Sequence, residues 1–431
     1  MDRFDTQKSE DLLARAREVI PGGVFGHYGT SVRRPGPKWF SRSDGAYFWD
    51  IDDNKYIDYM CAYGPMILGY NHPVVDEAAR TQYQAGNTVS VSSPVMVELA
   101  ELLVETVDAA DWALFGKNGG DSTSLAVRIA RAATGRTKIV KIQDGYHGVA
   151  PWMMASMATE EREIKGITKE DGANLLQIPW NDATAFEQLI AEYPDDIACF
   201  ISSPYDHPAM RDNALPEDGY WSKVESLCQK HGILLIVDDV RSGFRIDLAG
   251  SNVAYGFSAD MVCFGKAIAN GYPLSALVGR DSLKKVASEV FYTGSHFFQA
   301  APMAAAKACL VEMKKVDAAN QMTQFGNKLN DGLINIASQH GYDLKASGIP
   351  AMPYYRLTNV PFDIHSQWID ECVTRGVYLL NYHNHFVSTA HDDDDLNRTF
   401  DIVNEAFKAV SYTHLRAHET REDLVCRLLL E

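Results

Sequence analysis

Residues 233–245 have the sequence Ile-Leu-Leu-Ile-Val-Asp-Asp-Val-Arg-Ser-Gly-Phe-Arg. The first five residues are all apolar, a pattern typical of a strand that is buried on both faces of a parallel sheet. The run ends in Asp238, and parallel α/β sheets bind their ligands at the carboxyl ends of their strands. The segment therefore predicts an α/β fold with an acidic group at its ligand-binding edge.

The pattern of short apolar runs continues on both sides of this segment. Four further runs are strand candidates: 112–115, 138–142, 197–202 and 261–264. Helical patterns separate several of them, for example at 122–133 and 221–231. Alternation of this kind favours a mainly parallel sheet covered by helices.

The pattern also predicts how the chain divides. Residues 66–310 carry the alternation and form the expected large domain, while 311–410 form a smaller α+β domain. Residues 1–65 contain a helix, a loop and a hairpin, which are expected to belong with the smaller lobe. Residues 411–431 resemble translated sequencing adapter and are set aside as a non-native tail, with a genuine amphipathic terminal helix as the alternative.

The composition argues against several classes of function. The net charge of −17 over 431 residues disfavours extended nucleic-acid binding, which usually needs a basic face. The seven cysteines are scattered without a Cys-x-x-Cys pair, which predicts buried thiols in a reducing compartment and no metal site. The chain start is polar and no apolar run approaches a membrane span, so we expect a cytoplasmic protein with no membrane partner.

A lysine, Lys266, lies 28 residues after Asp238, within the sequence Phe-Gly-Lys-Ala-Ile-Ala-Asn-Gly at 264–271. An amine in a tight apolar loop loses its proton more easily than a solvated amine and can form a Schiff base with an aldehyde. An acid at a strand end can hold a pyridine nitrogen protonated, which makes the ring an electron sink. The pair therefore predicts pyridoxal 5′-phosphate (PLP) chemistry, although singly the acid can be a cap and the lysine a surface cation.

Two glycine-containing loops supply the other contacts that such a cofactor needs. Residues 115–124, Phe-Gly-Lys-Asn-Gly-Gly-Asp-Ser-Thr-Ser, follow one strand candidate and open a helix, whose N-terminal amides suit a phosphate. The alternative is a capped turn, and the Asp121 carboxylate must either cap the helix or point away from a phosphate. Tyr146, flanked by Gly145 and Gly148, can lie flat on a ring, or the loop can be a surface turn.

In this order, the segments resemble the class III (fold type I) PLP-dependent aminotransferases, and most of all their glutamate-1-semialdehyde 2,1-aminomutase-like branch. The resemblance extends from Pro21-Gly22-Gly23 to about residue 410 and is most specific at 238–245 and 264–271. It implies that Lys266 forms the internal aldimine, a Schiff base, with PLP. It also implies that Asp238 pairs with the pyridine nitrogen.

The same resemblance implies roles for the surrounding residues. Tyr146 and Val240 would pack on opposite faces of the ring, and the amides at 119–121, of Gly119, Gly120 and Asp121, would hold the phosphate. Ser295 stands where the family usually has a threonine that reaches the phosphate of the neighbouring subunit. The last role implies a homodimer with shared active sites.

The chain departs from the family pattern at three places. The usual Ser-Gly-Thr is Gly-Gly-Asp at 119–121, the usual Asp-Glu-Val is Asp-Asp-Val at 238–240, and the usual Glu-Pro-Val is Ser-Pro-Tyr at 203–205. Arg33, beside Arg34, is the candidate for binding a substrate carboxylate, with an exposed basic turn as the alternative. Tyr28 and Tyr63 are candidates for a substrate pocket or for the core.

These observations predict an aminotransferase that moves an amino group between an amine or amino acid and a keto or aldehyde acceptor. A PLP-dependent aminomutase or amino-acid epimerase on the same scaffold is the alternative. A binding or structural protein that has lost its chemistry is disfavoured, because both Lys266 and Asp238 are present.

Overall fold

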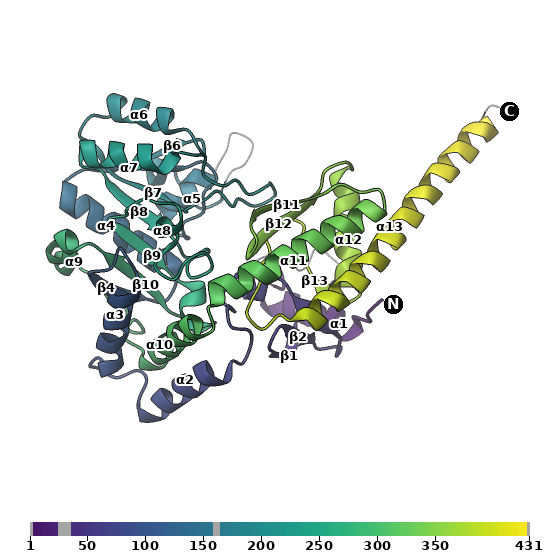
Figure 1. Cartoon of the computed structure of the whole chain (residues 1–431), viewed down its shortest axis with the longest axis horizontal. Helices are drawn as coiled ribbons and strands as arrows, with labels where there is room; N and C mark the ends of the chain where they lie inside the picture. The colour runs from purple at the N-terminus through teal and green to yellow at the C-terminus, as the bar shows by residue number, and fades with distance from the viewer. Residues whose placement is uncertain (1–2, 25–35, 158–163, 429–431) are drawn as a thin grey trace. The chain divides into compact units, whose positions relative to one another are not determined.

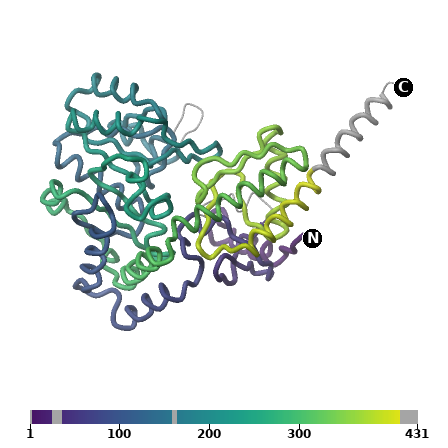
Figure 2. The backbone as a smooth tube through the Cα atoms, viewed as in Figure 1, coloured from purple at the N-terminus to yellow at the C-terminus, as the bar shows by residue number. Residues whose placement is uncertain are grey.

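The computed structural model describes residues 3–24, 36–157 and 164–428, and after Val410 only the backbone (Figures 1 and 2). The chain forms two compact units. The large unit is Gly64–Thr323, and the small unit combines Met1–Tyr63 with Gln324–Glu431. The boundary near residue 323 falls within helix α11 (Ala318–Gln339), so residues 311–323 belong to the large unit.

A seven-stranded sheet organises the large unit, in the order β4-β10-β9-β8-β7-β5-β6. Its strands are β4 (Trp112–Gly116), β5 (Lys138–Ile142), β6 (Leu175–Ile178), β7 (Ile197–Ser202), β8 (Leu234–Asp238), β9 (Met261–Phe264) and β10 (Ser275–Gly279). The neighbouring strands from β6 to β9 are parallel, while β10 runs antiparallel to both β4 and β9. The predicted mainly parallel α/β fold is confirmed.

The helices of the large unit cover this sheet (Figure 1). They are α2 (Pro73–Ala85), α3 (Pro94–Thr106), α4 (Gly119–Thr134), α5 (Pro151–Met154), α6 (Ala183–Glu192), α7 (Tyr220–His231), α8 (Ser251–Ala254), α9 (Lys284–Glu289) and α10 (Ala300–Lys315). Leu125 and Ile129 of α4 pack in one buried apolar cluster with Ile201 of β7 and Ile236 of β8. Burial of this apolar area holds α4 against the sheet and thereby fixes where its N-terminus lies.

The small unit contains two sheets. The first has the order β1-β2-β3-β13, formed by β1 (Phe40–Asp44), β2 (Tyr47–Asp50), β3 (Lys55–Asp58) and β13 (Val377–Tyr378). The predicted hairpin is confirmed, since β2 and β3 pair antiparallel with Tyr47 opposite Ile57. The second sheet pairs β11 (Leu344–Ile349) with β12 (Met352–Leu357), and the helices are α1 (Gln7–Val19), α12 (Phe362–Val373), α13 (Asp393–Leu428) and the part of α11 after residue 323.

Two further observations concern the described parts of the chain. The six cysteines whose side chains are described are all buried, and no disulfide joins any two of them. Among the described residues, none of the helices has the length and apolar character needed to cross a membrane. The backbone of α13 continues without a break through residues 411–428, and the assignment of 411–431 as a non-native tail stays a prediction.

Candidate active site

The two residues predicted to act together lie at the same edge of the large sheet. Asp238 is the last residue of β8 and pairs in register with Cys263 of β9, three residues before Lys266. Ala276 of β10 pairs with Phe264 of β9 and also with Phe115 of β4, so the loop that opens α4 belongs to this edge as well. The register of the sheet thus gathers three of the predicted segments.

Asp238 is buried, and its carboxylate is held by two hydrogen-bonding groups. Its Oδ2 lies 2.6 Å from Nδ1 of the buried His147, and its Oδ1 accepts a hydrogen bond from the Val240 amide at 3.1 Å. The Nε2 of His147 is buried with no hydrogen-bond partner among the described residues. The imidazole therefore fixes the orientation of the carboxylate at the floor of the site.

Lys266 begins a short 3₁₀ helix, Lys266–Ala269, and its backbone φ of +43° lies in the left-handed region. Non-glycine residues rarely adopt this conformation, and strained residues of this kind cluster at functional sites. Asn270 anchors the loop, because its side chain accepts the Leu68 amide at 2.9 Å and donates to the Gly69 carbonyl at 2.8 Å. The lysine is thus held at a defined place.

Its surroundings make the Lys266 amine a weak base. Burial, followed by the positive charges of Arg241 and Arg245, lowers its pKa from 10.5 to about 7, against the opposing effect of Asp238. A neutral amine is the nucleophilic form, so a large fraction of Lys266 is reactive near neutral pH. This agrees with the behaviour expected of an amine in this loop.

The carboxylate of Asp121 faces the backbone at the start of α4. Its Oδ2 accepts the backbone amides of Lys117 at 2.9 Å and Asn118 at 2.8 Å, so the carboxylate caps the helix and turns back on the chain. The amide of Asp121 itself donates to the Asn118 carbonyl at 2.9 Å. Three backbone amides were predicted to bind phosphate. Those of Gly119 and Gly120 lie in the first turn of the helix, where no preceding helical carbonyl can accept their hydrogen bonds, so these two amides are available to an anion.

Close packing explains why glycines stand at this helix start. A Cβ atom on Gly119 would lie 2.6 Å from Val240 Cγ1, and one on Gly120 would lie 3.4 Å from the Cα of Gly148. A Cβ on Gly265 would lie 3.1 Å from the same Val240 methyl. Val240 therefore packs between the turn that opens α4 and the Lys266 loop, while Tyr146 leaves 49% of its surface exposed.

These features fit PLP: a buried carboxylate for a ring nitrogen, a neutral lysine for an aldehyde, a helix N-terminus for a phosphate, and an apolar and an aromatic side chain for the ring. A family model described as aminotransferase class-III matches residues 31–406.

The chain belongs to the class III aminotransferases.

Curated relatives support this assignment. The chain is 39% identical over 415 residues to the aminopentol aminotransferase of Sphingopyxis macrogoltabida, covering 95% of this chain and 97% of that protein. It is 29% identical over 423 residues to the 3-aminobutyryl-CoA aminotransferase of Cloacimonas acidaminovorans, covering 95% and 99%.

Solved structures show the same relationship. The FumI protein of Sphingopyxis sp. MTA144, solved in its PLP internal aldimine form, superposes with a TM-score of 0.89 at 38% identity, covering 94% of this chain and 96% of that chain. A glutamate-1-semialdehyde aminomutase from Pseudomonas aeruginosa shares the fold, with a TM-score of 0.82 at 19% identity, covering 94% and 95%. This class III aminotransferase is therefore a PLP-dependent enzyme with the type I fold.

Several residues predicted from the sequence are not placed in the site by the structure. Tyr28, Arg33 and Arg34 lie outside the described residues. Tyr63 belongs to the small unit, where its hydroxyl lies 3.0 Å from that of Tyr382. Their roles in binding substrate stay predictions.

Ser295 is exposed, in the segment between α9 and α10 of the aminotransferase. Three residues earlier, the hydroxyl of Tyr292 lies beside Gly116, so close that a Cβ there would be 2.5 Å from it. The segment thus begins beside the end of β4, next to the turn that opens α4, and then reaches the surface. An exposed Ser295 is compatible with a role toward a second subunit, and that role stays a prediction.

Two residues of this site have no signal in the sequence that indicates a role. His147 lies in the loop that carries Tyr146, and Arg241 lies in the segment after Asp238. Asp239 stands where the family usually has glutamate. Its carboxylate accepts hydrogen bonds from the hydroxyls of Ser242 and Ser251, both at 2.7 Å. Burial raises the pKa of the Asp239 carboxyl.

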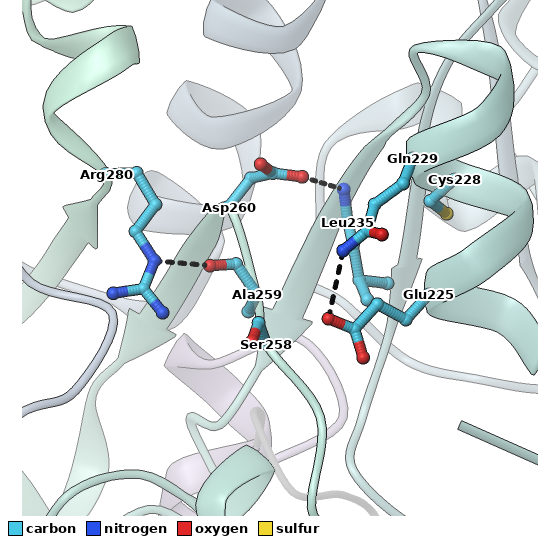
Figure 3. Close-up of a pocket in the computed structure, with 8 residues that line it drawn as sticks. All are labelled: Glu225, Cys228, Gln229, Leu235, Ser258, Ala259, Asp260 and Arg280. Carbon is cyan, nitrogen blue, oxygen red and sulfur yellow. Dashed lines mark hydrogen bonds between the residues drawn. The ribbon is translucent and has the colours of Figure 1, made fainter. Parts of the chain in front are cut away.

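A small pocket lies at the opposite edge of the sheet, at the amino ends of β8 and β9 (Figure 3). Asp260 accepts the Leu235 amide there at 2.7 Å, and Arg280 donates to the Ala259 carbonyl at 3.2 Å. Its volume of about 90 Å³ is well below the roughly 300 Å³ at which ligand pockets begin. The Asp238 edge therefore remains the candidate active site.

Proposed function

We propose that Lys266 and Asp238 are the catalytic pair of this aminotransferase. PLP, when bound, supplies an aldehyde that carries the amino group and a ring that accepts electrons. Lys266 would hold the cofactor at its aldehyde through the neutral amine, and when free it would serve as the base and acid at the substrate carbon. Asp238, oriented by His147, keeps a proton on the ring nitrogen. The support is the sheet register that brings both residues to one edge.

The remaining cofactor contacts follow from the same geometry. The amides of Gly119 and Gly120 are assigned to the phosphate, and Val240 and Tyr146 to the two faces of the ring. What supports this assignment is the close packing of Val240 against both glycine positions, 119 and 265, together with the half-exposed ring of Tyr146.

The proposed donor is a primary amine whose amino-bearing carbon does not also carry a carboxylate. Two relatives support this class of donor, since one acts on aminopentol, an amino alcohol by its name, and the other on a 3-amino acyl thioester. The 39% identity over nearly the whole chain favours the amino alcohol. A keto acid or an aldehyde is the proposed acceptor.

A donor screen tests this proposal. Amino alcohols, 3-amino acids and 2-amino acids are each incubated with pyruvate, 2-oxoglutarate or an aldehyde, and the carbonyl product is measured. We expect amino alcohols to give the highest kcat/KM. A preference for 2-amino acids would overturn the donor class, and turnover of an amine without any acceptor would favour the aminomutase or epimerase alternative.

We also propose a homodimer whose active sites are shared. The support is three exposed apolar side chains of the large unit, Val89, Val91 and Phe291, which are 56%, 73% and 79% exposed. The segments that carry these residues are joined: Asn87 accepts the Ala300 amide at 3.0 Å, and the Gln299 side chain donates to the Thr88 hydroxyl at 3.2 Å. Ser295 lies on the second of these segments.

The oligomeric state tests the shared site. Light scattering of the purified protein is expected to give twice the mass of one chain, and Val91→Asp with Phe291→Asp is expected to give monomers with reduced PLP occupancy. A fully active monomer would contradict the proposal. The cytoplasm is the proposed location, supported by the buried cysteines, of which the six described form no disulfides with one another, as suits a reducing compartment.

A further inference from the structure

Lys141 is a buried lysine that the chemistry proposed so far does not use. It stands near the carboxyl end of β5, and its side chain is fully buried. Its Nζ donates to the Ser156 hydroxyl at 2.9 Å, and that hydroxyl donates to the Met153 carbonyl at 2.7 Å. An ammonium group has three N–H donors. Within the described parts of the chain, Ser156 takes one of them, so the other two can serve a further acceptor.

The imidazole of His147 lies close to the end of this lysine side chain. A Cβ atom on Gly145 would lie 3.2 Å from His147 Nε2 and 3.7 Å from Lys141 Cε, so both atoms surround one point. His147 Nδ1 contacts Asp238 Oδ2, while the buried Nε2 has no hydrogen-bond partner among the described residues. The glycine thus leaves room where a buried acceptor and a buried donor both need a partner.

A water molecule fits this place by its hydrogen bonding. Buried waters in proteins typically bond polar groups that would otherwise be unsatisfied. Here a water would accept a hydrogen bond from Lys141 Nζ and donate one to His147 Nε2. Burial lowers the pKa of Lys141 to about 8, against the charge of Asp144, so the amine stays mostly protonated at neutral pH and keeps its donors.

We propose that Lys141 is a positioning residue for Asp238. Through a water molecule bound beside Gly145, it makes His147 Nε2 an acceptor and so keeps the imidazole proton on Nδ1, which faces the Asp238 carboxylate. The proposal rests on the role assigned to Asp238 at the ring nitrogen of PLP.

The tautomer of His147 decides which form of Asp238 is favoured. In a neutral imidazole one nitrogen donates and the other accepts. A proton on Nδ1 gives Asp238 Oδ2 a donor at 2.6 Å, which favours the charged carboxylate. A proton on Nε2 would set the Nδ1 lone pair against the carboxylate, which would then have to take up a proton. A protonated Asp238 would not keep the ring nitrogen of PLP charged.

Crystallography of the holoenzyme tests the water site. We expect an ordered water within hydrogen-bond distance of both His147 Nε2 and Lys141 Nζ, in a map that shows other buried waters clearly. A dry site between the two atoms, or a direct bond from His147 Nε2 to another protein group, would overturn the water bridge.

Nitrogen-15 NMR of protein labelled at the histidine rings tests the tautomer, with and without PLP. His147→Gln identifies the signals by their loss. In the wild type, we expect Nδ1 to carry the proton. Lys141→Met removes the donors at similar length, so it should shift the proton toward Nε2 and slow single-turnover chemistry roughly threefold to tenfold, as for loss of one hydrogen bond.

Gly145→Ala tests the same bridge with Lys141 in place. The added methyl group would lie 3.2 Å from His147 Nε2 and take the space of the water, and the backbone at 145 does not have the positive φ that favours glycine. We expect the same shift of the His147 proton as in Lys141→Met.

Lys138→Met is the matched control. Lys138 is the first residue of β5, at the opposite end from Lys141, and its Nζ lies 3.6 Å from Asp196. It should leave the tautomer and the single-turnover rate unchanged. An unchanged tautomer in both Lys141→Met and Gly145→Ala, or an equal change in Lys138→Met, would overturn the proposal. The cofactor-free spectra separate it from the role of Asp238, which fails instead if Asp238→Asn leaves the chemical step unaltered.

Discussion

Adding one methyl group at Gly119 is predicted to damage cofactor binding more than it damages the fold. A Cβ at this position would lie 2.6 Å and 2.8 Å from the two methyl carbons of Val240. Alanine gains about 1 kcal/mol over glycine in helix propensity, whereas overpacking of this kind costs about 1–3 kcal/mol. Gly119→Ala should therefore be close to neutral or mildly destabilising in thermal unfolding.

The effect on PLP binding is expected to be larger. Val is stiff at χ1, so the start of α4 has to move away from Val240 rather than Val240 from it. That movement takes the amides at 119 and 120 away from the phosphate. Hydrogen bonds to charged groups contribute about 1.5–3 kcal/mol each, so loss of one weakens PLP binding roughly ten- to hundredfold.

A double-mutant cycle tests the cause. Val240→Ala removes both methyl carbons and leaves only a Cβ contact of 3.2 Å, so the double variant should bind PLP about as tightly as Val240→Ala alone. Gly135→Ala is the matched control at the other end of α4, because a Cβ there meets nothing within 4 Å, although its φ of +69° makes the change mildly strained. Wild-type affinity in Gly119→Ala, or no rescue in the double variant, would refute the steric argument. Titration of cofactor-free protein with PLP provides the affinities.

Four further predictions follow from the site. Lys266→Ala should abolish transamination and leave PLP bound without covalent attachment, and borohydride should then fix no cofactor; normal turnover would contradict its role. Asp238→Asn should reduce the chemical step by at least tenfold, as seen in single-turnover kinetics, with little loss of thermal stability, because it removes the charge that keeps the ring nitrogen protonated. His147→Leu should lower kcat with a smaller effect on KM, since the 2.6 Å contact with Asp238 is lost, and an unaltered kcat would show that the contact only supports the fold. Below pH 7, the cofactor-free wild type should be less stable to thermal unfolding than Lys266→Met, because folding of the wild type buries an ammonium group. This difference in stability should shrink as the pH rises from about 7 toward 10.5, because in that range only the unfolded wild type still binds the proton.

The strands that bring the site together could be predicted because they are buried on both faces. In β7 every residue is buried, and in β8 all but the first, so their sequences are continuous apolar runs. β6 and β10 were not predicted. β6 is a half-exposed edge strand, and β10 consists of the sequence Ser-Ala-Leu-Val-Gly, whose apolar run is only three residues long.

Site residues could be predicted where the chemistry resides in one segment. Lys266 and Asp238 each stand in a recognisable local sequence, and the sheet register then places them together. His147 is 91 residues from Asp238 along the chain, and the contact depends on the loops after β5 and β8, which no local pattern encodes. Arg241 depends in the same way on the carbonyl of His207, 34 residues away.

Asp121 shows a different limit of sequence reasoning. Its sequence allowed two outcomes, a helix cap or a carboxylate turned away from the phosphate. The structure shows one carboxylate oxygen accepting two backbone amides, a geometry set by the exact path of the turn at 117–121. Such a path depends on the packing of Val240 against the glycine at 119, which lies far away in sequence.

The left-handed backbone at Lys266 has a practical consequence for protein engineering. The backbone at position 266 has a conformation that glycine or asparagine would adopt with less strain. Its side chain is a buried amine, and burial makes the charged form of that amine unfavourable. A screen that selects variants for thermal stability alone will therefore enrich substitutions at this position, all of them inactive. Directed evolution of this enzyme needs a selection for turnover at every round, because the residue that gives the most stable protein at position 266 is not the lysine that activity requires.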